Sequence, residues 1–233
     1  MRNRTALERP QLALPAAPPL DAPPDFASRL ALLGVSFDHA AVAKLGAFLA
    51  YLLAMNEQMN LTAIEDPAAA WERHALDALT LVPHLAEVAP GERVLDVGSG
   101  GGVPGLPLAI ARPDLRFVLL DATSKKVDFL SAVAAALGLS NVQATSGRAE
   151  ALVRGEMRGS FAAVTARAVA KVDALLPWTA PFARPGGRLL FIKGERAEAE
   201  LADARGTLKK LRCTLDRVVL TPTGRVVVLR VGG

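Results

Sequence analysis

Cysteine and aromatic residues are scarce in this chain of 233 residues, which contains one cysteine, Cys213, and 5% aromatic residues. A single cysteine excludes an intramolecular disulfide, a cysteine-rich zinc site and a CxxC redox pair, which favours a reducing compartment. Long apolar runs are also missing: no stretch of about 18 residues is free of both charge and proline, and the N-terminus has no signal-peptide pattern. We therefore expect a soluble, cytoplasmic protein without a membrane partner.

An excess of charge of either sign is likewise small. The chain has 27 Lys and Arg against 23 Asp and Glu, a net charge of +4. This balance permits an anionic partner such as nucleic acid, but a basic, solvated surface without any partner explains it equally well. Half of the residues are hydrophobic (51%), which excludes wholesale disorder, and the length suits one main domain.

Two different patterns occupy the first 90 residues. Residues 1–24 lack helical or alternating periodicity and are interrupted by prolines at positions 10, 15, 18, 19, 23 and 24, which predicts a disordered tail. In residues 25–90 the apolar side chains recur at helical spacing, first over 26–59 and then over 67–85. We expect a small helical subdomain there, packed as one unit with residues 91–233.

Residues 91–233 alternate short apolar runs with amphipathic helices, which is typical of βαβ units and a mainly parallel sheet. The predicted parallel strands are 94–97, 117–120, 142–145, 161–165 and 188–192. Only four residues separate the last two runs, 215–220 and 225–231, and this connection is too short for a parallel crossover. The sequence therefore predicts an α/β fold that ends in an antiparallel hairpin.

A glycine-dense turn comes after the first predicted strand, with glycines at 98, 100, 101 and 102 after Asp96. A triphosphate-binding P-loop is excluded because Leu106 and Pro107, rather than Lys and Ser or Thr, come after Gly105. A dinucleotide site stays open, since 100–105 fits G-x-G-x-x-G, although Asp96 would repel a pyrophosphate. S-adenosylmethionine suits the loop better: Asp96 can attract its ammonium, directly or through water, and the backbone amides near Gly98 and Gly100 can donate hydrogen bonds to its carboxylate.

A second acidic residue, Asp121, ends the second predicted strand, 25 residues after Asp96. This is the position from which a carboxylate accepts both ribose hydroxyls of a bound nucleoside. Asp121 is also suited to cap the helix that opens near Ser124, and the two functions are compatible.

Several ordered sequence blocks resemble the bacterial small-subunit rRNA guanine-N7 methyltransferases, a family also called RsmG or glucose-inhibited division protein B (GidB). The resemblance spans roughly residues 40–231 and rests on the blocks Asn56-x-x-x-Asn60-Leu61-Thr62, Arg73-His74-x-x-Asp77, Asp96 to Pro107, Arg112-Pro113, Leu120 to Lys126, Gly147 to Glu150, Ala166-Arg167-Ala168 and Lys193-Gly194. It implies a Rossmann-like class I S-adenosylmethionine-dependent methyltransferase with a seven-stranded sheet.

The same resemblance implies functional residues and partners. The implied cofactor contacts are Gly98, Val103, Asp121, Ala122, Thr123, Ala149, Glu150 and Arg167. The implied substrate is a guanine in the 530 loop of 16S rRNA, position 527 in the usual rRNA numbering, as RNA or in the 30S subunit. We expect a monomer that uses no metal and does not act on DNA.

The residues themselves restrict the methylated atom. Cys213 lies far from the strand ends that line such a cleft, which disfavours cytosine C5 chemistry. The segment 165–169 lacks the Asn/Asp-Pro-Pro-aromatic pattern of amine methylation. Guanine N7 holds an in-plane lone pair and needs no general base. Arg167, at the end of the fourth predicted strand, is placed to bind guanine O6 or a phosphate, unless it is a surface arginine paired with a helix acid.

Three further residues are candidates for the catalytic rim. Lys193 ends the fifth predicted strand and is expected to contact a phosphate. His74 stands three residues before Asp77, so a hydrogen bond between them would give a satisfied, half-buried histidine. The alternative places Asn60, Arg73 and His74 on a lid that grips RNA. A small-molecule methyltransferase, an NAD-dependent oxidoreductase and a non-catalytic RNA-binding module remain rival functions.

Overall fold

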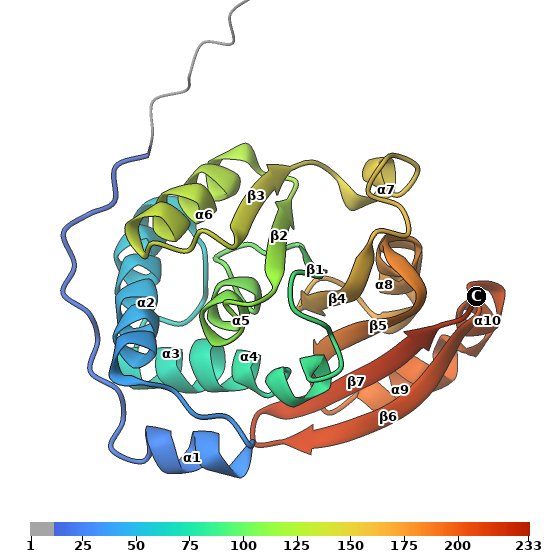
Figure 1. Ribbon diagram of the computed structural model, residues 1–233, viewed down its shortest axis with the longest axis horizontal. Coiled ribbons are helices and arrows are strands. Elements are labelled where there is room, and N and C mark those ends of the chain that lie inside the picture. Colours follow the sequence, from blue (N-terminus) through green and yellow to red (C-terminus); the bar gives the residue numbers. More distant parts are fainter. Residues whose placement is uncertain (1–11) are drawn as a thin grey trace, which may run out of the picture.

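The computed structural model describes residues 12–233, which form a seven-stranded sheet with helices on both faces (Figure 1). The strands are β1 (Arg93–Val97), β2 (Arg116–Asp121), β3 (Val142–Ser146), β4 (Phe161–Arg167), β5 (Ala183–Lys193), β6 (Cys213–Thr221) and β7 (Gly224–Val231). Their order is β3-β2-β1-β4-β5-β7-β6; the first five are parallel, and β7 is antiparallel to both neighbours. The predicted fold, terminal hairpin included, is confirmed.

Alternating side chains divide the core between the two faces of the sheet. The helices are α1 (Phe26–Leu32), α2 (His39–Met59), α3 (Pro67–Ala70), η1 (Trp71–Leu76), α4 (Asp77–Leu79), η2 (Val82–Leu85), α5 (Gly105–Ala111), α6 (Ser124–Ala136), α7 (Ala149–Leu152), α8 (Val172–Thr179), η3 (Ala180–Phe182), α9 (Ala197–Asp203) and α10 (Arg205–Lys210). On β2, Phe117 and Leu119 join the cluster under α2, α5 and α6, while Val118 and Leu120 join the cluster under α7, α8 and α9.

The long helix α2 is capped at its N-terminus by Asp38, whose carboxylate accepts the Ala41 N–H at 2.7 Å. Its C-cap is Asn60, which adopts a left-handed conformation with φ 49°. By length and composition α2 would pass for a membrane span. Its apolar side chains are instead packed in the core, where Leu45, Phe48 and Leu49 have no exposed surface. Core packing therefore accounts for the apolar composition of this helix.

The helical subdomain has no separate core. Phe26 and Trp71, whose rings meet edge to face at 4.8 Å, belong to the same buried cluster as Phe117 of β2 and Val228 of β7. The predicted helical stretch 67–85 is present but divided: a π-helix (η1) separates α3 from α4, and a 3-10 turn (η2) comes after them.

The proline-rich segment differs from the disordered tail that we expected over 1–24. Residues 12–22 run without helix or strand, and Leu20 donates its N–H to the Gly46 carbonyl of α2 at 3.1 Å. A Cβ on Gly46 would lie 2.3 Å from the Leu20 oxygen, so this contact requires glycine. Prolines block helix and sheet but not an extended chain, which packs Leu12, Leu14 and Leu20 against the core. The rest of the tail, 1–11, lies outside the described residues.

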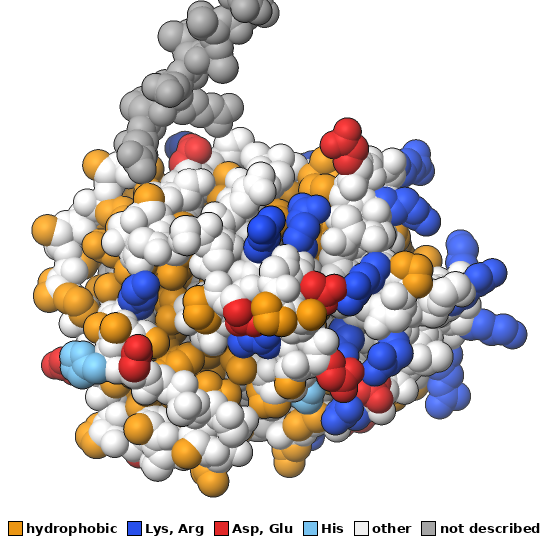
Figure 2. Space-filling view, in the orientation of Figure 1, with side chains coloured by type: hydrophobic (Ala, Val, Ile, Leu, Met, Phe, Trp, Pro, Cys, Tyr) orange, Lys and Arg blue, Asp and Glu red, His pale blue; other side chains and the backbone are white. Residues whose placement is uncertain are grey.

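Charged side chains are unevenly distributed over the surface. Figure 2 shows Lys and Arg gathered at the end of the molecule where α10 adjoins β6 and β7, on the right of the view. Exposed hydrophobic side chains are more frequent over the helices at the opposite end. The small net charge of the chain thus conceals a local excess of cations.

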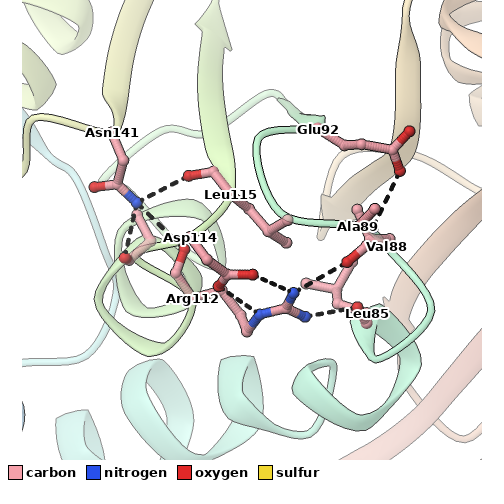
Figure 3. Close-up of polar contacts among 9 residues, drawn as sticks. Leu85, Val88, Ala89, Glu92, Arg112, Asp114, Leu115 and Asn141 are labelled. Carbon is pink, nitrogen blue, oxygen red and sulfur yellow. Dashed lines mark hydrogen bonds and ion pairs between the residues drawn. The ribbon is translucent and has the colours of Figure 1, made fainter.

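Arg112 connects the helical subdomain to the edge of the sheet at which the parallel strands begin (Figure 3). Its guanidinium donates to the carbonyls of Leu85 and Val88 at 2.6 and 3.1 Å and pairs with Asp114 at 2.7 Å. Asn141, beside it, donates to three carbonyls, among them Ala109 at 3.0 Å. The Arg112-Pro113 block is therefore structural, and it lies away from the ends of the strands that form the site.

Candidate functional site

The glycine turn connects β1 to α5 at the carboxyl edge of the sheet, beside the point where strand order reverses between β1 and β4. Ligands of such sheets bind at this point. Gly98 has φ +71°, and a Cβ there would lie 2.8 Å from the Val169 side chain. Only glycine combines this backbone conformation with so close an approach.

Asp96 is completely buried beneath this turn. Its carboxylate accepts the Thr165 hydroxyl at 2.8 Å and the Gly105 N–H at 3.2 Å, and so joins β1, β4 and the start of α5. Burial raises the pKa of Asp96 to about 6, against the lowering effect of its hydrogen bonds. Because the carboxyl has no exposed surface, its negative charge acts on a ligand through the turn rather than by direct contact.

Asp121 holds the turn from the end of β2. One carboxylate oxygen accepts the Gly100 N–H at 2.9 Å and the other accepts the Thr123 N–H at 2.8 Å. Thr123, not Asp121, occupies the N-cap position of α6, and its side chain makes no capping bond. Each oxygen of Asp121 keeps a second lone pair, with which it can still accept a hydrogen bond from a ribose hydroxyl.

The remaining candidate cofactor residues lie around the same strand ends. The Gly147 N–H donates to the Asp121 carbonyl at 3.0 Å, which brings the start of α7, with Ala149 and Glu150, next to β2. Ala149 is buried, whereas Glu150 and Ala122 are exposed. The structure thus collects the predicted cofactor residues along one edge of the sheet.

Arg167 ends β4 and is largely buried, with 19% of its side chain exposed. Its guanidinium donates to the Arg73 carbonyl and to His74 Nδ1, the latter at 3.0 Å, and lies 3.6 Å from the Asp77 carboxylate. Burial lowers the pKa of Arg167, and Asp77 opposes that shift. The pairing with a helix acid that we considered is present, but this is not a surface arginine.

These contacts define the protonation of His74. A guanidinium can only donate, so Nδ1 accepts from Arg167, and Nε2 carries the proton that is donated to Thr62 Oγ1 at 2.8 Å. Burial, and then the charge of Arg167, lower the pKa of His74 to about 4. His74 is therefore neutral at pH 7. The expected hydrogen bond to Asp77 is wrong, because the His74 ring bonds to Thr62 and Arg167, while the Asp77 carboxylate bonds to other partners.

Asp77 is bonded instead by a residue that the sequence did not reveal. Thr223, in the turn between β6 and β7, donates its hydroxyl to Asp77 Oδ1, and its carbonyl accepts from Arg73 Nη1 at 3.2 Å. A threonine in a turn carries no sequence signal for a contact across 146 residues. The terminal hairpin therefore completes the surroundings of Arg167.

Lys193 and Asn60 are placed differently from expectation. The Lys193 ammonium pairs with Glu200 at 2.7 Å and donates to the Ala170 carbonyl at 2.6 Å, so it holds the loop after β4 and is already neutralised. Asn60 is an exposed residue at the end of α2 that lines neither of the two pockets around Arg167. Asn56 takes part instead, because its side chain accepts the Thr62 N–H at 2.8 Å.

These two pockets form adjoining compartments that meet at Arg167. The inner compartment, about 130 Å³, is lined by the glycine turn, and the outer compartment, about 430 Å³, is lined by residues that include Arg73, Asp77, Lys193 and Glu200. Both share the residues Leu61, Thr62, His74, Arg167 and Ala168. A group held in the inner compartment can therefore react with one held in the outer compartment beside Arg167 and His74.

The residues around the inner compartment suit S-adenosylmethionine better than a dinucleotide. Carboxylates stand at the ends of both β1 and β2, where they favour a cationic ligand and disfavour a pyrophosphate. The side chains of Leu52 and Val103 supply an apolar wall.

Comparisons with known proteins agree with this geometry. The sequence model of a family described as rRNA small subunit methyltransferase G matches residues 41–225. A protein of Sorangium cellulosum named ribosomal RNA small subunit methyltransferase G is 56% identical over 226 residues, which cover 97% of this chain and 95% of the relative.

Solved structures show the same fold at low identity. The antibiotic-resistance methyltransferase Kmr superposes with a TM-score of 0.51 at 19% identity and covers 66% of this chain and 93% of its own. Pyrococcus horikoshii TYW2, in complex with MeSAdo, gives 0.51 at 15% identity, covering 64% and 60%. These neighbours share the class I methyltransferase fold.

Proposed function

The chain belongs to the rRNA small subunit methyltransferase G family, so its reaction is rRNA methylation with S-adenosylmethionine, and we propose that the methylated atom is N7 of a guanine in the 530 loop of 16S rRNA. The membership sets aside the NAD-dependent, small-molecule and non-catalytic functions that the sequence left open. We further propose that the protein acts as a monomer in the cytoplasm, on 16S rRNA either as RNA or in the 30S subunit.

One observation carries the choice of N7: the outer compartment offers hydrogen-bond donors but no free base. His74 has its unprotonated nitrogen occupied by Arg167, Asp77 is bonded to Arg167 and Thr223, and Glu200 is bonded to Lys193. An exocyclic amine must lose a proton when it is methylated, and these groups are poorly placed to take one. Guanine N7 already presents a lone pair, so positioning and electrostatics suffice.

Arg167 would orient the base. Its donors suit guanine O6, which lies next to N7 on the same edge of the base. When bound, S-adenosylmethionine supplies an electrophilic methyl group, and the positive charge passes from sulfur to the base. Asp77, 3.6 Å from the guanidinium, balances the charge of Arg167 and so limits repulsion of the developing cation. Asp96, Gly98, Gly100, Val103, Asp121 and Thr123 would hold the cofactor.

The cofactor site is tested by calorimetric titration with S-adenosylmethionine. Gly98→Val forces a side chain onto a φ of +71° beside Val169, and Asp96→Ala removes the tie between β1, β4 and α5, so each should weaken binding about tenfold or more. Gly138→Ala is the control, because Gly138 also has positive φ, +64°, but lies at the end of α6 with no atom within 4 Å of an added Cβ. Unchanged affinity in both site variants would contradict the assignment.

The methylated atom is tested on 16S rRNA from a strain that lacks the modification, after treatment with the purified protein. Methylation at N7 weakens the glycosidic bond, so borohydride reduction and then aniline should cut the RNA at the modified guanine in the 530 loop. A methylated RNA that resists this cleavage, or one that is cut elsewhere, would require a different atom or nucleotide.

A further inference from the structure

Cations are concentrated in the segment from Arg205 to Arg217. This stretch of α10 and the start of β6 contains five Lys or Arg residues and one acid, Asp216. Its net charge of +4 equals that of the whole chain. The remaining residues of the protein are therefore neutral in sum, and the excess is local, as Figure 2 shows at the α10 end.

Most of these cations have no acidic partner within the described residues. Among the described residues, no Asp or Glu side chain lies within ion-pair distance of Arg205, Lys209, Lys210 or Arg212, and all four are exposed. By contrast, each arginine on or near the adjoining strands forms an ion pair with an Asp or Glu side chain; these arginines are Arg184, Arg188, Arg217, Arg225 and Arg230. We call the four unpaired residues the α10 surface.

Stability does not account for the α10 surface. Arg205 and Lys209 stand at i,i+4 on a helix that contains no acid, an arrangement that costs a few tenths of a kcal/mol. Lys209 and Lys210 gain something at the carboxyl end of the helix dipole, but Arg205 opens the helix, where a cation is unfavourable. Arg212 lies beyond the helix with φ 53° and donates to the carbonyl of Gly233.

The α10 surface and the compartments face different edges of the sheet. Cys213, next to Arg212, pairs with Val231, and Arg230 pairs with Arg188. Arg188 in turn pairs with Ala163 near the start of β4, so this edge is the one where the parallel strands begin. The compartments lie where those strands end. One nucleotide cannot touch both.

We propose that the α10 surface binds the phosphate backbone of the rRNA substrate at a segment distant from the methylated guanine. Unpaired Lys and Arg side chains recognise phosphate charge independently of sequence and add affinity without touching the reacting base. The inference rests on RNA being the substrate, and it assigns recognition of the large substrate to a surface separate from the site of reaction.

The test uses the full chain with the charge-reversal variant K209E/K210E/R212E. Steady-state methyl transfer is measured with unmodified 30S subunits, with deproteinised 16S rRNA and with a short RNA stem-loop that contains only the target nucleotide. KM for 16S rRNA should rise at least tenfold near 100 mM salt, with kcat within about twofold. Binding of 16S rRNA is measured by fluorescence anisotropy at several salt concentrations. The slope of the logarithm of the binding constant against the logarithm of the salt concentration should become less steep by roughly 2 to 3. KM for the stem-loop should not change.

The control variant R116E/R154E/R158E alters net charge equally at exposed cations elsewhere in the chain. An unchanged KM for 16S rRNA in K209E/K210E/R212E, or an equal rise in both variants, would overturn the proposal. A rise with 30S subunits but not with deproteinised RNA would overturn it in favour of an acidic ribosomal protein. Failure of the wild-type chain to methylate any RNA would instead overturn the proposed function, and the anisotropy comparison would still decide this inference.

Discussion

Arg167 and Asp77 form a largely buried charged pair whose members are each held by further polar contacts. Arg167 also reaches His74 and the Arg73 carbonyl, and Asp77 also accepts from Thr223. Removing one member of such a pair leaves the other charge uncompensated in a poorly solvated site, which costs more than the pair itself contributes. The residues that we propose to orient the substrate should therefore also affect folding.

Arg167→Ala should reduce methyl transfer by one or more orders of magnitude, because a positioned, charged donor is lost. From the sequence alone, a rim residue of this kind would leave the melting temperature nearly unchanged. The structure predicts a lower melting temperature, since Asp77 is left without its cation. Arg167→Lys should recover only part of the rate, because an ammonium cannot reproduce contacts to both His74 and Arg73.

Cofactor affinity must be measured on the same Arg167 variants. A wild-type rate combined with wild-type affinity in Arg167→Ala would show that this residue lies outside the active site.

Burial of Asp96 makes stability depend on pH. Its folded pKa, about 6, lies above the ordinary value of 3.8, so the folded state binds the proton more tightly. The associated stability is fully present below pH 3.8 and is lost as pH rises through about 6, by at most ~3 kcal/mol. Urea unfolding of the wild type and of Asp96→Asn, compared from pH 4 to 7.5, should show the wild type losing stability relative to the variant. A constant difference between the two chains over this range would disprove the shift.

At the scale of elements, local patterns are predictable from the sequence and distant contacts are not. The alternation of apolar runs and helices predicts the parallel strands, and the density of glycines after Asp96 predicts the turn. The π-helix is not evident in the sequence, and its contacts with α2 and its hydrogen bond from Arg167 to the Arg73 carbonyl join residues far apart in the chain. For the same reason the spacing of His74 and Asp77 suggests a bond that the structure does not contain.

The turn between β6 and β7 offers a matched pair of substitutions. Thr223→Val removes the hydroxyl that holds Asp77, so kcat should fall about tenfold while cofactor affinity is kept, and Thr223→Ser should restore the rate. Thr221→Val, two residues earlier, removes a buried hydroxyl that has no hydrogen-bond partner among the described residues, and should be neutral or stabilising. Equal effects of the two valine variants on kcat would show that Thr223 does not position Arg167.

At the scale of the whole molecule, the helical subdomain and the sheet share one buried cluster, from Phe26 to Val228. Sequence periodicity separates these parts at about residue 90, because it detects the change from helices to strands but not which surfaces meet. We expect a single cooperative unfolding unit.

The two tryptophans of the chain make this testable, since Trp71 lies in the helical subdomain and Trp178 in α8 of the opposite layer. Urea unfolding of Trp71→Phe reports on α8, and that of Trp178→Phe reports on the subdomain. Circular dichroism of each variant also gives the effect of the substitution itself on stability. In both variants, the urea midpoint measured by tryptophan fluorescence should coincide with the midpoint measured by circular dichroism. A fluorescence transition that precedes the loss of helix in either chain would indicate two separately folding parts.

The bond between Asp77 and Thr223 has a consequence for biosynthesis. A ribosome that makes this chain releases the helices around Asp77 well before the hairpin turn with Thr223, which comes 146 residues later. Until that turn emerges, the carboxylate beside Arg167 lacks its second partner, and the proposed active site of the nascent chain is unfinished. A protein that modifies ribosomal RNA therefore becomes competent only after the ribosome has made the turn that holds Asp77.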